Sequence, residues 1–133
     1  MANIEKLEDL VTWQKARRLT TEIYRITSNG SFSRDFGLRD QIRRASVSVV
    51  SNIAEGYGRG GNKEFLQFLS LSEGSLYEVK TQLYIASGIS YINAENLTRL
   101  TEDIEEILRM INGLIKYLKS SDIKGTKYKK TEN

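Results

Sequence analysis

The sequence predicts an all-α fold, an antiparallel up-down-up-down four-helix bundle. Apolar residues recur every three or four positions along four long segments, which is the period of a helix with one buried face. The 133 residues include no proline, so the commonest helix breaker is absent throughout. Only short connections separate the four segments, and short connections favour antiparallel neighbours in a bundle.

Composition narrows the class of protein. Because the chain has no cysteine and no histidine, it lacks disulfides, thiolate and imidazole metal ligands, and Ser-His or Cys-His catalytic pairs, so we expect no cofactor and no enzymatic activity. No stretch has the apolar length of a signal peptide or a membrane span, which predicts a soluble, cytoplasmic protein. Residues 1–119 are predicted to form one bundle domain, and residues 120–133 a basic, disordered tail.

The first helix is expected to begin between Lys6 and Glu8 and to end at residues 28–30, where Gly30 supplies a left-handed cap. Its predicted buried face consists of Trp13, Ala16, Leu19, Ile23 and Ile26. The cations Arg17, Arg18 and Arg25 point outward, either as an ordinary solvated surface or, less commonly, as contacts for nucleic acid.

Residues 30–37 connect the first helix to the next. They contain glycine and serine and follow Asn29, so they are predicted to form a loop. Phe32 and Phe36 are expected to pack on the end of the bundle. Ser33 or Asp35 is expected to cap the next helix, where an acidic side chain also suits the helix dipole.

The central helix, residues 38–59, carries two apolar stripes. At 100° per residue, one face gathers Leu38, Ile42, Ala45, Val49, Ile53 and Gly56. A second stripe, Val47, Val50 and Ala54, faces nearly opposite. A helix on the outside of a small bundle needs only one buried face, so the second stripe predicts packing against another helix of this chain or against another copy of the protein.

Asn52 lies on the first apolar face, and it is predicted to be buried and hydrogen-bonded, fixing register or subunit pairing. Glu55 is its only titratable neighbour, which makes a catalytic role the less favoured alternative. The helix is expected to break in the glycine-rich run at residues 56–61. That run lacks the Lys-Ser or Lys-Thr pair of a phosphate-binding loop.

Asn62 is predicted to cap a third helix that runs to about Ser87. Its core stripe consists of Phe65, Phe68, Leu69, Ser72, Leu76, Val79, Leu83 and Ala86. Gly74 lies in the middle of this helix, at a cost of about 1 kcal/mol relative to alanine. We therefore expect Gly74 to allow close approach of the central helix near Ala45 and Ser48.

The last helix is expected to follow a turn packed by Tyr91 and Ile92, with Asn93 as its cap. Its apolar seam extends to Leu118, and four acidic residues occupy its outer face: Glu102, Asp103, Glu105 and Glu106. Residues 64–119 carry a net charge of −3, against +3 for residues 34–63. Such complementary charge fits either an anionic partner or contacts between subunits.

The basic residues chosen as candidate contacts for RNA or DNA are Arg17, Arg18, Arg39, Arg43, Arg59 and Lys63, together with the tail lysines. Arginines near Asp40 and Glu55 form ion pairs between helices more often than phosphate contacts, so both interpretations stay open. No base-reading motif accompanies these cations.

Several short runs resemble a known family, and they cover most of the chain to about Leu118. The runs are Trp13-Gln14, Gly37-Leu38, Gln41-Ile42-Arg43-Arg44-Ala45, Ser51-Asn52-Ile53-Ala54-Glu55-Gly56 and Glu73-Gly74-Ser75-Leu76. The chain resembles the four helix bundle family named after the protein encoded in intervening sequences of bacterial 23S ribosomal RNA genes. It is also similar to the accessory variability determinant protein of diversity-generating retroelements.

The resemblance implies a ring-like homopentamer without established catalytic activity, with a basic surface that binds nucleic acid and a reverse transcriptase. The first hypothesis is therefore a non-enzymatic scaffold that binds RNA or DNA with steep salt dependence. The alternative is a ring that organises a partner protein through the acidic last helix and Tyr57, Tyr77 and Tyr84. An enzyme is the least favoured hypothesis, since a carboxylate metal site in a bundle usually includes histidine.

Overall fold

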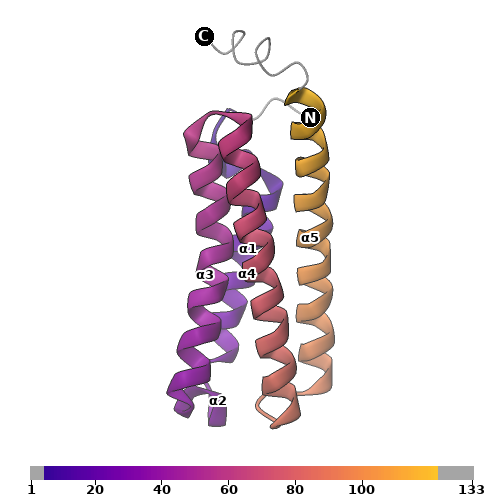
Figure 1. Cartoon of the computed structure of the whole chain (residues 1–133). Coiled ribbons are helices and arrows are strands. Elements are labelled where there is room, and N and C mark those ends of the chain that lie inside the picture. The colour runs from indigo at the N-terminus through magenta and orange to yellow at the C-terminus, as the bar shows by residue number, and fades with distance from the viewer. Residues whose placement is uncertain (1–4, 123–133) are drawn as a thin grey trace.

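The computed structural model describes residues 5–122. A short 3-10 turn, η1 (Leu7–Asp9), precedes five α-helices: α1 (Val11–Ile26), α2 (Gly30–Arg34), α3 (Phe36–Arg59), α4 (Asn62–Gly88) and α5 (Ala94–Asp122). No β-strand occurs in this range, so the predicted all-α class is confirmed. The four long helices form a bundle in which α1 and α4 each pack against both α3 and α5 (Figure 1).

Contacts between distant residues define the two ends of the bundle. At the end where α2 lies in Figure 1, the Tyr91 hydroxyl between α4 and α5 donates to Asp35 at 2.9 Å, and its ring centroid lies 5.3 Å from that of Phe32. At the opposite end, Asn62 Nδ2 donates to the backbone carbonyl of Leu118 at 3.4 Å. The start of α3 is thus tied to the α4–α5 connection, and the start of α4 to the last turns of α5.

The core runs the length of the bundle, and it contains the apolar stripes that the helical period predicts. Trp13, Ile26, Leu38 and Phe68 lie half-buried at its edge instead of inside it. Its largest fully buried side chains are Phe32, Leu19, Ile23, Ile42, Ile53, Leu69, Leu76, Leu83, Leu100, Ile104, Ile107 and Ile111. None of the helices within residues 5–122 is long and apolar enough to cross a membrane.

The connection between α1 and α3 differs from the prediction. Residues 30–34 form the short helix α2 instead of a loop, because the buried Phe32 anchors a helical turn beneath the bundle. Phe36, predicted to pack on the bundle end, is 63% exposed as the first residue of α3. Phe32 and Tyr91 already fill the space at this end, so only one of the two phenylalanines is buried.

The first helix is shorter than predicted. Extended backbone at Leu10 separates η1 from α1, and α1 ends at Ile26, with Thr27 as its C-terminal cap. The last helix is longer, since α5 continues through Asp122, three residues beyond the predicted domain boundary at residue 119. The rest of the predicted tail, residues 123–133, lies outside the described residues.

The predicted break of the central helix within residues 56–61 is confirmed. The helix continues through the first two glycines of that run to Arg59, and it ends where Gly60 adopts the left-handed conformation, with φ of 81°. Gly56 and Gly58, which lie within four residues of the end of α3, therefore remain helical. The helix ends only at Gly60, where the backbone needs a positive φ.

Among the glycines of α3 and α4, Gly56 is the one at which the two helices leave no room for a side chain. A Cβ atom added at Gly56 would lie 2.8 Å from Phe68 Cβ and 3.0 Å from Phe65 Cδ1. The sequence-based assignment of this role to Gly74 is wrong, because a Cβ atom at Gly74 would meet nothing within 4 Å. The glycine that permits close approach therefore lies at the carboxyl end of α3, while small serines make the contact in the middle, where Ser72 Oγ donates to the Val49 carbonyl at 2.8 Å.

Two of the three predicted side-chain caps are confirmed. The Leu38 backbone N–H donates to Asp35 Oδ1 at 3.1 Å, and Asn93 Oδ1 accepts from the Asn96 backbone at 2.7 Å. The third prediction is wrong: Gly61 precedes α4 without a side-chain cap, and Asn62 is buried as the first residue of the helix. Its amide instead satisfies a carbonyl near the end of α5.

Asp35 gives the fold a specific pH dependence. The hydrogen bond from the Leu38 backbone, and next that from the Tyr91 hydroxyl, hold the pKa of Asp35 below its ordinary value of 3.8. A carboxyl with a lowered pKa stabilises the fold above its unfolded-state pKa, and the contribution disappears as the pH falls through the folded-state pKa. Below about pH 4, Asp35→Asn should therefore lose less stability than the wild type, since asparagine still caps the helix.

Thermal unfolding followed by circular dichroism between pH 2 and 7 measures this difference. Tyr91→Phe removes one of the two hydrogen bonds and should give an intermediate pH profile. Identical profiles for wild type and Asp35→Asn would show that this carboxyl does not contribute to acid sensitivity.

Candidate nucleic-acid interface

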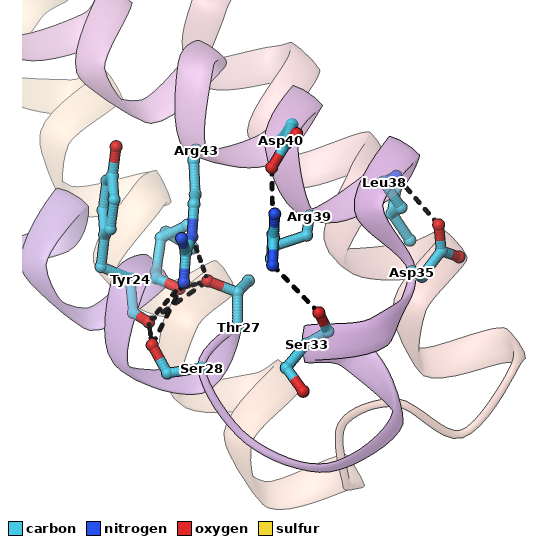
Figure 2. Close-up of polar contacts among 10 residues, drawn as sticks. Tyr24, Thr27, Ser28, Ser33, Asp35, Leu38, Arg39, Asp40 and Arg43 are labelled. Carbon is cyan, nitrogen blue, oxygen red and sulfur yellow. Dashed lines mark hydrogen bonds and ion pairs between the residues drawn. The ribbon is translucent and has the colours of Figure 1, made fainter.

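Arg43 joins α3 to the carboxyl end of α1. Its Nε donates to Thr27 Oγ1 at 2.8 Å, and its Nη2 donates to Ser28 Oγ at 3.1 Å and to the Tyr24 carbonyl at 3.4 Å (Figure 2). A cation suits this position because the last carbonyls of a helix lack partners and carry the negative end of its dipole. The guanidinium also lies over the Tyr24 ring, 4.5 Å from its centroid.

Arg39 lies one helical turn from Arg43, toward the start of α3. Its Nε donates to Asp40 Oδ1 at 3.0 Å and its Nη1 to the Ser33 carbonyl at 3.1 Å (Figure 2). Its guanidinium lies 4.7 Å from the centroid of the Phe36 ring. The prediction of ion pairs between helices is wrong for both arginines, since Arg39 pairs within α3 and Arg43 with no carboxylate of the described chain.

Arg17 extends the same face along α1. Its guanidinium lies 5.8 Å from the centroid of the Trp13 ring, and its side chain is exposed. Thr20 Oγ1 donates to the Ser46 carbonyl at 2.9 Å, so this side of α1 adjoins the side of α3 that carries Arg39 and Arg43. We call Trp13, Arg17, Tyr24, Phe36, Arg39 and Arg43 the arginine-aromatic face.

The second apolar stripe of α3 borders this face. Val47 is 38% exposed, Ala54 is half-buried, and the half-buried Val50 packs against the core, so the stripe is only partly covered within one chain. At 100° per residue, all three lie within about 80° of Arg39 around the helix axis. Self-association through this stripe would therefore bring the arginines to the edge of the interface between copies.

The six predicted nucleic-acid contacts do not form one patch. Arg17, Arg39 and Arg43 share the arginine-aromatic face, and Arg18 lies beside Arg17 on α1. Arg59 pairs with Glu55 at 2.9 Å and lies near the opposite end of α3, about 30 Å from Arg39 along the axis. Lys63 is exposed at that same end, in the first turn of α4.

The sequence model of the 23S rRNA-intervening sequence protein family matches residues 8–113. The chain belongs to this family. A solved structure from Bacteroides thetaiotaomicron, a protein with unknown function from the S23 ribosomal protein family, has a TM-score of 0.72 to this chain. The two are 22% identical, over 79% of this chain and 98% of that one, which shows a common fold. No curated protein matches the chain.

The run at residues 51–56, which carries much of the resemblance to this family, has structural contacts here. Asn52 is half-buried, not buried as predicted, and its Nδ2 donates to the Ser48 carbonyl at 2.8 Å and to Ser48 Oγ at 3.0 Å. Ser48 Oγ in turn lies 2.9 Å from Ser75 Oγ on α4. Asn52 thus supports the α3–α4 contact, while Glu55 is exposed and paired with Arg59.

A second set of ion pairs ties α1 to α5 on the side away from α3. Lys15 pairs with Glu106 at 3.3 Å and Glu22 with Arg99 at 3.0 Å, both between α1 and α5. Glu22 also pairs with Arg25 within α1. These cations are therefore partly neutralised. Within residues 5–122, no group of three or more acidic side chains is arranged to hold a metal ion.

The aromatic partners of the arginines are the residues that sequence reasoning missed. Trp13 and Arg17 are four residues apart and Phe36 and Arg39 three apart, which are contact spacings on a helix, so this signal was readable. Tyr24 and Arg43 are far apart in sequence, and their contact depends on how α1 packs on α3.

Proposed function

We propose that this member of the 23S rRNA-intervening sequence protein family is a non-enzymatic, oligomeric, cytoplasmic protein that binds RNA or DNA through the arginine-aromatic face. The observation that carries the proposal is that three arginines on one face each lie over an aromatic ring. Arginine stacked on a ring keeps its charge and can contact phosphates, and aromatic side chains in such grooves stack with bases.

The proposal includes the assembly of the protein. We infer an antiparallel up-down-up-down order, supported by the Tyr91–Asp35 contact at one end and the Asn62–Leu118 contact at the other. We infer a homo-oligomeric ring, a homopentamer by resemblance, supported by the partly exposed stripe of Val47, Val50 and Ala54. Repeating a modest basic face around a ring multiplies phosphate contacts without any new residue.

Charge removal on this face tests the proposal. The double variant Arg17→Ala/Arg39→Ala should weaken binding of a labelled 20-nucleotide RNA about tenfold or more near 0.1 M salt, and should reduce the slope of log Kd against log salt. Fluorescence anisotropy over a salt series measures both quantities. Light scattering and circular dichroism establish that the variant assembles and folds as the wild type does.

A matched control is available at the far end of α3. Arg59→Ala/Lys63→Ala removes the same charge from residues outside the arginine-aromatic face, and it should change Kd much less. Equal losses for the two double variants would contradict the location of the site. Absence of binding by the wild-type protein at low salt would contradict nucleic-acid binding itself.

One observation favours the alternative, a ring that organises a partner protein such as a reverse transcriptase. Tyr77 and Tyr84 are each 54% exposed and lie two turns apart on α4, next to the acidic surface of α5. Tyr57, predicted to join them, is half-buried and packs edge-to-face on Phe65 at 6.3 Å. Recovery of one protein at fixed stoichiometry after nuclease treatment, lost in Tyr77→Ala/Tyr84→Ala, would support this alternative.

A further inference from the structure

A hollow of about 550 Å³ opens beside α1, next to the arginine-aromatic face. Its lining comes from η1 and α1 alone and includes Trp13, Gln14, Arg17, Arg18 and Thr21, with the acidic residues Glu8 and Glu22 beside them. Its volume falls within the range of about 300–1,000 Å³ that is typical of sites for small ligands. Trp13 and Arg17 belong both to this lining and to the arginine-aromatic face, whereas none of the contacts described above for Arg39 and Arg43 extends into it.

We propose that this hollow binds one unpaired nucleobase of a single strand, so that the protein prefers single-stranded to duplex nucleic acid. The inference rests on the proposed function, because the neighbouring arginines hold the backbone of the same strand. The site offers a ring and a guanidinium side by side, because the Arg17 guanidinium lies over the Trp13 ring, 5.8 Å from its centroid. Bases stack on both aromatic rings and guanidinium planes.

The polar lining suits the edge of a base. Gln14 Nε2 donates to the Glu8 carbonyl at 2.6 Å, which orients its Oε1 as an acceptor for an exocyclic amino group. Thr21 Oγ1 donates to the Arg17 carbonyl at 3.1 Å, so its hydroxyl oxygen presents lone pairs to a further donor. Arg18, which pairs with no carboxylate of the described residues, supplies positive charge at the rim for a phosphate.

A duplex cannot use this hollow. Its bases are stacked and paired, and one must be unstacked and turned out before it can enter a concave site. A single strand or a loop presents the base at little cost. The remaining arginines contact only the backbone, so they would bind either form.

Trp13 is the only tryptophan in the protein, so its fluorescence reports on the end of the arginine-aromatic face where the hollow opens. A single-stranded oligonucleotide should quench Trp13 emission with the Kd that anisotropy gives for the same strand. An abasic strand of equal length should bind by anisotropy without quenching, and a hairpin duplex should bind about tenfold more weakly than the single strand.

Filling the hollow provides the second measurement. Thr21→Phe should reduce the preference for the single strand to near one while leaving duplex binding unchanged. Thr81→Phe is the matched control, since Thr81 is also exposed and donates to the carbonyl four residues earlier, Tyr77, but lies on α4. It should leave the preference intact.

The two proposals fail in distinguishable ways. Binding of single strands by anisotropy without quenching, or a preference that survives Thr21→Phe, would overturn the base-binding hollow and leave the arginine-aromatic face standing. Absence of any binding by anisotropy at low salt would overturn both.

Discussion

Replacing Phe32 with alanine is expected to lower the free energy of unfolding by about 3–5 kcal/mol. The side chain is fully buried at 0% exposure, and its ring packs 5.3 Å from that of Tyr91. No other aromatic side chain can fill the cavity, because Phe36 points outward on α3. Urea unfolding followed by circular dichroism, at one fixed protein concentration since the protein is proposed to self-associate, measures the loss.

Phe36→Ala serves as the matched comparison four residues away. Its side chain is 63% exposed, so its loss should change the free energy of unfolding by no more than about 0.5–1 kcal/mol. Equal destabilisation of the two alanine variants would show that Phe32 of α2 does not fill the core at this end of the bundle. Phe32→Leu, which keeps most of the buried volume, should fall between them.

Gly56→Ala is expected to destabilise the bundle by about 1–3 kcal/mol, although alanine is the better helix former. The added Cβ would lie 2.8 Å from Phe68 Cβ, an atom fixed by its own backbone, so α3 and α4 would have to separate. The same change at Gly74 meets open space and should stabilise the protein by up to about 1 kcal/mol.

The two substitutions are expected to change the free energy of unfolding in opposite directions, so their comparison tests the close contact directly. Both glycines lie inside helices, and both variants add one methyl group. Urea unfolding of the pair measures the difference directly. Stabilisation by Gly56→Ala would mean that the helices are not in close contact there.

Much of the fold follows from the sequence because helical periodicity is a local signal. The buried stripes of the long helices, and the caps at Asp35 and Asn93, depend on residues at most a few positions apart. The corner at residues 30–36 does not, since a five-residue helix is held by the burial of Phe32 against a residue far along the chain. The exposure of Phe36 follows from that same contact.

The glycines show the same limit. In the sequence, Gly56 begins a glycine-rich run at the end of the central helix, whereas Gly74 is a single glycine in the middle of the third helix, which made Gly74 the candidate for a close approach. Which of them lies at the closest approach depends on where α3 and α4 cross, and that is set by the whole pairing of the two helices. The sequence assigned the role to Gly74, and the structure assigns it to Gly56.

The sequence predicts which basic residues belong to the candidate site, but not which of them lie together in space. Arg17, Arg39 and Arg43 were identified as basic candidates, and Trp13 could have been added from its spacing to Arg17. Arg59 was named with them as a basic residue, and it also lies over an aromatic ring, 5.2 Å from the Phe68 centroid, but at the other end of α3. A helix rises about 1.5 Å per residue, so twenty residues separate side chains by most of the bundle length.

The hydrogen bonds of Arg43 determine what kind of contribution it can make to binding. Two of its three guanidinium nitrogens already donate to oxygens at the carboxyl end of α1. A phosphate near Arg43 would therefore be attracted by its charge but would find few free N–H donors for hydrogen bonds. Such a group speeds the encounter between the protein and a polyanion, because attraction at a distance needs charge alone. The lifetime of the complex then depends on arginines whose N–H donors are free to bind the phosphate.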